Sequence, residues 1–197
     1  MKGGGKMESA LIVTLSEKSA AYFSEILSAA SVNQIVALPT CAEARRLLLE
    51  RDFDLVLINA PLRDESGENL SRYIASRGVS QVILVVKNEY FDAVSSLCED
   101  DGVLVVAKPV NKSIFWSALR LAKSAQSRLK RIQAENSKLK QKIEDIRIVD
   151  RAKCILISYF NMSEQEAHRY IEKQAMDMRT AKRAIAEGIL KTYESPL

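Results

Sequence analysis

Few residues in this chain of 197 have the types and spacing that catalysis or metal binding requires. His168 is the single histidine, and Cys41, Cys98 and Cys154 lie far apart, with no CxxC pair and no Cys/His cluster. A zinc site needs clustered ligands and a disulfide framework needs suitably spaced cysteines, so neither is expected. There is also no Gly-rich phosphate loop and no nucleophile beside a base. We therefore expect no enzyme, no cofactor and no bound metal.

Basic residues gather in the C-terminal part of the chain. Residues 1–122 carry 13 Lys and Arg against 15 Asp and Glu, whereas residues 123–197 carry 16 against 10. The overall net charge of +4 therefore hides a net charge of +6 on the C-terminal part. Such an excess points to a polyanionic partner such as nucleic acid, although a basic coiled coil with solvated flanks has the same composition.

Apolar runs of strand length alternate with amphipathic helical stretches between residues 8 and 121. The five runs are residues 10–15, 34–38, 55–58, 82–86 and 103–107. Helical stretches lie near residues 19–31, 41–50, 68–76 and 91–98, and a fifth at 111–123 can continue into the next part of the chain. This order predicts a doubly wound, five-stranded parallel α/β sheet with helices on both faces.

Residues 122–150 are predicted to form one long helix with an apolar stripe. With Phe115 at position a of a heptad, the a and d positions keep a 3.5-residue period that one asparagine interrupts. These positions are Phe115, Ala118, Ala122, Ala125, Leu129, Ile132, Asn136, Leu139, Ile143 and Ile146. A seam asparagine favours parallel, two-stranded pairing, because other registers would bury an unpartnered amide. We predict a parallel coiled-coil homodimer with its seam at residues 129–146; the alternative is a helix that packs its stripe on its own domain.

The last part of the chain has the pattern of three short helices, at residues 146–159, 163–178 and 180–193. Ser163 and Glu166 have the spacing of a capping box, which satisfies exposed amides at a helix start. Apolar positions recur every three or four residues, which is enough for a small all-α three-helix bundle. The predicted division is a flexible tail at 1–7, an α/β domain at 8–121, a coiled-coil linker at 122–146 and a helical domain at 147–193.

The sequence has no apolar run of 18 residues and no cationic-then-apolar signal at its start. We therefore expect no membrane span and a cytoplasmic location.

The N-terminal alternation resembles the receiver domain of two-component response regulators, and the stretch Ala107-Lys108-Pro109-Val110 is the closest match to its motifs. In that family an acidic pair after the first strand binds Mg²⁺, and an Asp at the end of the third strand accepts a phosphoryl group. A Thr or Ser ends its fourth strand, and a Lys precedes Pro after the fifth. The chemistry needs all of these groups together, since carboxylates hold the metal while metal and ammonium neutralise the phosphoryl charge.

Most of those groups are replaced here. Thr14 and Leu15 stand at the acidic pair, Asn59 at the phosphoacceptor and Val86 at the Thr/Ser position, so only Lys108 remains. An amide cannot form an acyl phosphate, and Thr-Leu cannot hold a hard dication. The resemblance therefore predicts a pseudo-receiver, a receiver fold without phosphotransfer, whose input is a regulatory protein or a small ligand.

Two acidic residues follow the third strand. Asp64 and Glu65 could substitute as phosphoacceptors, but a loop position several residues along would not face the pocket lysine.

A second resemblance covers almost the whole helical part. Its motif is Ala152-Lys153, Leu156, Ser163-x-x-Glu166-Ala167, Tyr170-Ile171, Gln174-Ala175-Met176, Arg179 and Ala184-Ile185-Ala186-x-x-Ile189, which looks like the ANTAR domain, the RNA-binding module of bacterial transcription antitermination regulators. Cys154 departs from the family, which commonly has a small Gly there. The resemblance implies a homodimer that binds paired hairpins in a leader RNA.

Candidate RNA-binding residues are basic, polar or aromatic groups of this module: Lys153, Arg169, Tyr170, Lys173, Gln174, Arg179, Lys182 and Arg183. Lys153, Gln174 and Arg179 are favoured because they lie inside the motif. Charges at helical spacing can also form only a solvated face, and Tyr170 can pack in the core instead of stacking on a base.

Two other functions remain open. A basic three-helix module could dock on DNA, although its short, Ala-rich last helix lacks a convincing base-reading face. The degenerate receiver also suits a protein–protein signalling adaptor of two-component type.

Overall fold

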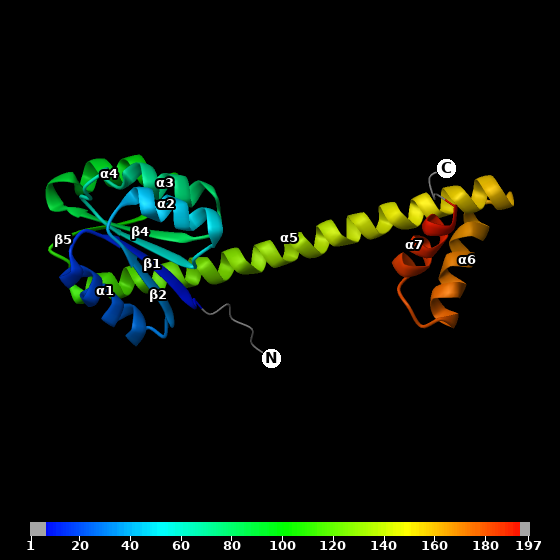
Figure 1. Cartoon of the computed structure of the whole chain (residues 1–197), viewed down its shortest axis with the longest axis horizontal. Coiled ribbons are helices and arrows are strands. Elements are labelled where there is room, and N and C mark those ends of the chain that lie inside the picture. The colour runs from blue at the N-terminus through cyan, green and yellow to red at the C-terminus, as the bar shows by residue number, and fades with distance from the viewer. Residues whose placement is uncertain (1–6, 194–197) are drawn as a thin grey trace. The chain divides into compact units, whose positions relative to one another are not determined.

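The structure is a computed structural model that describes residues 7–193 (Figure 1). It divides into two compact units, Met1–Ile132 and Gln133–Leu197. Most of the predicted N-terminal tail, residues 1–6, lies outside the described residues. Met7, which the prediction placed in the tail, is instead buried in the core of the first unit. None of the helices at residues 7–193 combines the length and apolar character needed to cross a bilayer.

The first unit is built on a sheet of five parallel strands in the order β2-β1-β3-β4-β5. The strands are β1 (Ser9–Thr14), β2 (Gln34–Leu38), β3 (Leu55–Asn59), β4 (Gln81–Lys87) and β5 (Leu104–Lys108). Strands buried on both faces are apolar throughout, which is why each one appears in the sequence as a short continuous apolar run. The predicted fold class is confirmed.

Helices cover both faces of this sheet (Figure 1). One face carries α2 (Cys41–Glu50), α3 (Glu68–Ser76) and α4 (Phe91–Cys98), with the 3₁₀ turn η1 (Asn88–Tyr90) before α4; the other carries α1 (Glu17–Ala29) and the start of α5 (Lys112–Phe160). Successive strand residues alternate between the two cores, as Leu11 and Ile12 do. This alternation follows from the two-residue period of a strand.

The beginning of α5 belongs to the core of the first unit. Phe115 and Ala122 are fully buried, and the Phe115 ring centre lies 5.2 Å from that of Phe23. At these two positions, the heptad stripe before residue 129 packs inside the first unit and cannot pair with a second chain. Side chains hold α5 beyond the predicted domain boundary at 121, because Gln126 and Lys130 both contact the Asp54 carboxylate, at 3.4 and 2.5 Å.

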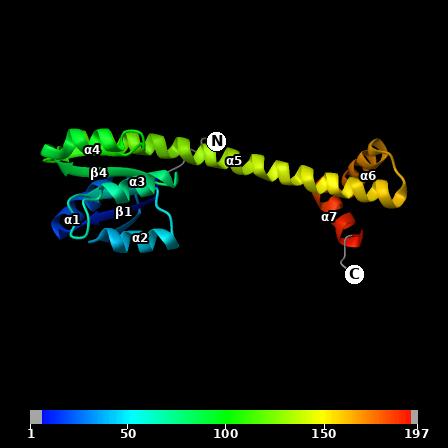
Figure 2. The same ribbon diagram turned by 90° about the horizontal axis from the view of Figure 1, so that it is seen from above.

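The second unit consists of the C-terminal part of α5, α6 (Glu164–Asp177) and α7 (Lys182–Tyr193). Figure 2 shows α6 and α7 beside that part of α5. The small core contains Ala152 and Leu156 of α5, Ala167 and Ile171 of α6, and Ala186 of α7. The predicted separate helix at 146–159 is wrong, because α5 continues through these residues and contains no Gly or Pro that would end it.

The predicted capping box at the start of α6 is confirmed. The Ser163 amide donates to a Glu166 carboxylate oxygen at 2.8 Å, and the Glu166 amide donates to the Ser163 hydroxyl at 3.3 Å.

Candidate functional sites

Two of the receiver-like positions, Asn59 and Lys108, line one cleft at the carboxyl edge of the sheet. Thr14 and Asn59 are register partners at the ends of β1 and β3, and the Asn59 amide donates to the Thr14 hydroxyl at 2.9 Å. Lys108, at the end of β5, donates from its ammonium to the Ala60 carbonyl oxygen. Replacement of the acidic residues has therefore produced a neutral Asn–Thr pair beside a retained lysine.

The Lys108 ammonium lies in an unfavourable environment for a cation. Partial burial lowers the pKa of Lys108 below its ordinary value, and the positive charge of Lys87 lowers the pKa further. Among the described residues, the side chains lining the cleft include two lysines and no carboxylate. Without hard anionic ligands the cleft does not suit Mg²⁺.

Sequence reasoning missed the α1 contribution to this cleft. Lys18, Ser19 and Tyr22 line it together with Asn59 and Lys108. The sequence did contain a signal for this contribution. These residues follow the first strand by only a few positions, so the helix that carries them begins at the same edge of the sheet.

The acidic loop residues have structural partners away from the cleft lining. Asp64 accepts hydrogen bonds from the amides of Cys41 and Ala42, at 3.1 and 2.9 Å, at the start of α2. Glu65 forms an ion pair with Arg45 at 3.0 Å. Cys41, Asp64 and Glu65 place possible metal-binding atoms within 4.8 Å of one another. Burial and the two carboxylates, however, raise the pKa of the Cys41 thiol to about 12, which disfavours the thiolate that binds metals.

The basic candidates of the second unit fall into two groups, and the first is engaged in ion pairs. The Lys153 ammonium lies 2.8 Å from the Asp150 carboxylate and 2.9 Å from that of Glu164, and these partners raise the pKa of Lys153. Only 15% of the Lys153 side chain is exposed. Lys153 therefore links α5 to the start of α6.

Two further candidates are also paired. Lys182 forms an ion pair with Glu172, and Arg183 contacts the carboxylates of Asp145 and Glu187, both at 2.7 Å. These pairs connect α7 to α6 and to α5, which gives Lys182 and Arg183 a structural role whether or not they also contact RNA.

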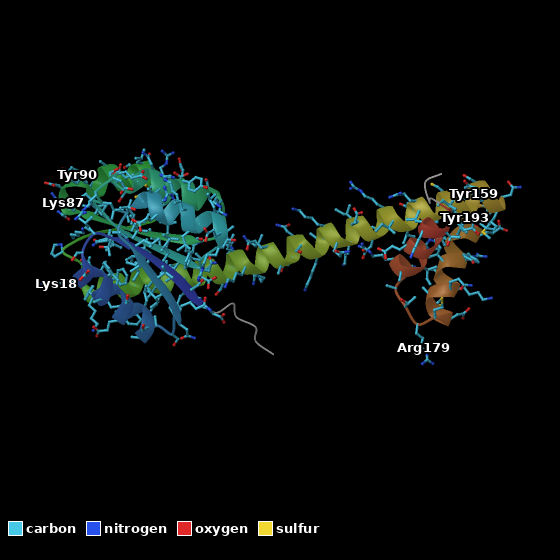
Figure 3. All side chains as sticks on the ribbon, in the orientation of Figure 1. Lys18, Lys87, Tyr90, Tyr159, Arg179 and Tyr193 are labelled. Atoms are coloured by element: carbon cyan, nitrogen blue, oxygen red, sulfur yellow. The ribbon has the colours of Figure 1, made fainter. Side chains whose placement is uncertain are left out.

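The second group is exposed on α6 and the turn that follows it. Arg169 and Lys173 are four residues apart, so they share one helix face, and the Tyr170 side chain beside them is 41% exposed. Gln174 is half-buried. Arg179, in the left-handed backbone region at φ 50°, points away from both helices (Figure 3). Within residues 7–193, Lys173 and Arg179 form no ion pair, whereas the positive charge of Arg169 acts on Glu166 and helps to lower the pKa of that carboxyl.

The predicted seam residues of α5 are exposed in the single chain. Exposure is 42% at Ile132, 56% at Leu139, 52% at Ile143 and 60% at Ile146. Asn136 is exposed and Leu129 is half-buried. Large apolar side chains at heptad spacing with this exposure are typical of a pairing surface.

Comparison with known proteins gives a family for the second unit. Residues 137–190 match the ANTAR domain family. The transcriptional regulatory protein PdtaR of Mycobacterium tuberculosis is 27% identical over 143 residues, which cover 73% of this chain and 70% of that protein. The nitrate regulatory protein of Klebsiella oxytoca is 26% identical over 121 residues, covering 58% of this chain and 30% of that protein.

Solved structures resemble the first unit. The signal receiver domain of an HD domain-containing protein from Pseudomonas fluorescens has a TM-score of 0.58 at 20% identity, and the match covers 66% of this chain and 97% of that chain. The receiver domain of NtrC4 has a TM-score of 0.53 at 19% identity, covering 59% and 97%. The first unit therefore has the receiver fold. Together with the ANTAR domain at residues 137–190, it gives the chain the architecture of an ANTAR-domain response regulator, and the resemblances found in the sequence are confirmed.

Proposed function

We propose that this chain is a cytoplasmic transcription antitermination regulator that binds a leader RNA with paired hairpins as a parallel homodimer. The observation that carries the proposal is the exposed basic surface of the ANTAR domain, formed by Arg169, Lys173 and Arg179 with the Tyr170 ring beside them. Exposed cations suit phosphate, and an exposed ring can stack on an unpaired base of a hairpin loop.

A homodimer that pairs through α5 carries two ANTAR domains, which would account for an RNA with two hairpins. The exposed stripe at residues 129–146 can hold two copies together, so that each contributes one ANTAR domain. Once the first hairpin is bound, the second meets its domain at high effective concentration. The dimer therefore favours a paired RNA over either hairpin alone.

The first unit serves, in this proposal, as an input domain that works without phosphorylation and not as an enzyme. The support is the neutral Asn59–Thr14 pair, which offers no carboxylate to phosphorylate and no anionic ligand for Mg²⁺.

RNA binding tests the proposal. Fluorescence anisotropy at several salt concentrations would compare a paired-hairpin RNA, each single hairpin and duplex DNA. We expect tighter binding to the paired RNA, with affinity unchanged by acetyl phosphate and Mg²⁺. The double variant Lys173→Ala, Arg179→Ala should bind more weakly and lower the salt slope by about one unit per lost phosphate contact.

Arg46 and Arg63 give the matched control, since both are exposed basic residues of the first unit. Replacing them with Ala removes the same charge and should leave RNA affinity almost unchanged. Equal binding to duplex DNA, or an equal loss in the control, would contradict the proposal. Phosphate-dependent affinity would contradict its input part.

A further inference from the structure

The receiver cleft has a charge opposite to the one that phosphotransfer requires. Lys18 and Lys108 both line it, and its lining includes no Asp or Glu among the described residues. A partly buried cation without a counter-charge is unfavourable, and a bound anion would relieve that cost. The side chains at this cleft suit an anion better than a metal ion.

Lys87 adds to this positive field. It follows the buried part of β4, and its register partner is Lys108 on β5. Figure 3 labels Lys18 and Lys87 at the same end of the first unit. Lys87 has its own carboxylate partner, Glu89, at 3.4 Å, whereas the hydrogen bond from Lys108 goes to a neutral carbonyl group.

The cleft also has room for a small molecule and a partly apolar wall. Its volume is about 370 Å³, and Tyr22, Pro109 and Val110 form part of its wall. Small-molecule sites usually combine such an apolar wall with a few polar groups that fix orientation. Ser19 provides a hydroxyl, and the first turn of α1 adds the partial positive charge of a helix start. Ligands of open α/β sheets commonly bind at this edge, outside the carboxyl ends of the strands.

We propose that the cleft binds a small organic anion noncovalently, with a phosphate or carboxylate group between Lys18 and Lys108 and an apolar body against Tyr22 and Val110. The binding needs no Mg²⁺ and forms no covalent bond. This inference extends the proposed role of the first unit as an input domain. Its test contains no RNA, so the two proposals fail separately.

Isothermal titration calorimetry of the full chain tests the site with three probes. Phenyl phosphate carries both the anion and an apolar ring, inorganic phosphate carries the anion alone, and benzyl alcohol carries the ring alone. We expect phenyl phosphate to bind most tightly, inorganic phosphate more weakly and benzyl alcohol not at all. A chelator should change none of these results. Benzoate in place of phenyl phosphate then shows which anionic group the site prefers.

Two lysine variants assign the binding to the cleft. Lys108→Met and Lys18→Met should each weaken phenyl phosphate binding about tenfold or more, because each removes a charged contact. Lys18 is exposed, so its variant keeps the fold even if Lys108→Met does not. Lys138→Met, an exposed lysine of α5, is the matched control and should bind as the wild type does.

Three results would overturn the inference. The first is the absence of a heat of binding at millimolar phenyl phosphate. The second is an equal affinity of Lys18→Met and wild type for phenyl phosphate, and the third is binding that requires Mg²⁺.

Discussion

The two parts of α5 show how one heptad pattern can have two structural outcomes. In the first part, Phe115 and Ala122 are fully buried against the sheet of their own unit. In the later part, Leu139, Ile143 and Ile146 continue the same spacing but are more than half exposed. Periodicity therefore identifies an apolar face, whereas the neighbouring elements decide what covers it.

Polar contacts of Asp54 mark the end of the part of α5 that packs against the first unit. Asp54 accepts hydrogen bonds from the amides of Glu8 and Ser9, at 2.6 and 3.2 Å, and an ion pair from Lys130 at 2.5 Å. The carboxylate thus joins the start of β1 to α5, and after Lys130 the helix leaves the sheet. The later stripe is free for a partner chain.

Loss of a buried ring in the first part should have the largest effect. Phe115→Ala removes a side chain packed against Phe23, and such a change costs about 3–5 kcal/mol of the free energy of unfolding. The single tryptophan, Trp116, lies beside it, so its fluorescence during urea unfolding reports on this unit. Ile114→Ala, at a neighbouring residue that is 59% exposed, should change stability by less than about 1 kcal/mol. If the two substitutions lowered the free energy of unfolding equally, the buried and exposed faces of α5 would not differ in their contribution to stability.

A charge in the later part should act on association and leave the first unit's stability unchanged. In a paired seam, Ile143→Asp buries two uncompensated carboxylates, which costs about 3 kcal/mol and weakens the dimer about a hundredfold. Sedimentation should show a dimeric wild type and a mostly monomeric variant. Ser137→Asp, outside the heptad seam, should remain dimeric. A wild type that is monomeric at high micromolar concentration would mean that the stripe has another partner.

The Asp54 contacts should give a smaller, pH-dependent effect. Burial raises the pKa of Asp54, but the bonds from Lys130, Glu8 and Ser9 together lower it below its ordinary value. A carboxyl with a lowered folded-state pKa stabilises the protein above its unfolded-state pKa and loses that contribution as pH falls through the folded-state value.

Asp54→Asn should therefore cost about 1–3 kcal/mol at neutral pH, and its difference from wild type should shrink below about pH 4. Urea unfolding at both pH values measures this. Asp52→Asn is the control, because the ion pair between Asp52 and Arg77 is on the surface and contributes little. A difference between Asp54→Asn and wild type that does not change with pH would show that the charge of Asp54 does not matter.

The fold was predictable because its signals are local. Each strand of the sheet is a short apolar run, and Ser163 and Glu166 mark the start of α6 within four residues. The continuous α5 was only partly predictable, since the change from heptad to bundle pattern near Ile146 resembles a boundary although nothing there ends a helix.

The site details depend on residues far apart in the sequence. Contacts of Asp54 with Gln126 and Lys130 join segments more than 70 residues apart, so no local pattern reveals them. The pair between Asp145 and Arg183 joins residues 38 positions apart, which is also too far for a local pattern to reveal. The sequence motif could identify Lys153 as a candidate but could not show that two carboxylates already hold it.

The most direct test of the account measures RNA stoichiometry and affinity for wild type and Ile143→Asp side by side. Sedimentation velocity with a labelled paired-hairpin RNA gives the number of chains bound, and anisotropy gives the affinity for paired and single hairpins. We expect two wild-type chains per paired RNA and a clear preference for it, whereas the monomeric variant should bind paired and single hairpins with similar affinity. One wild-type chain per RNA, or a preference that survives in the monomeric variant, would contradict a dimer that reads two hairpins.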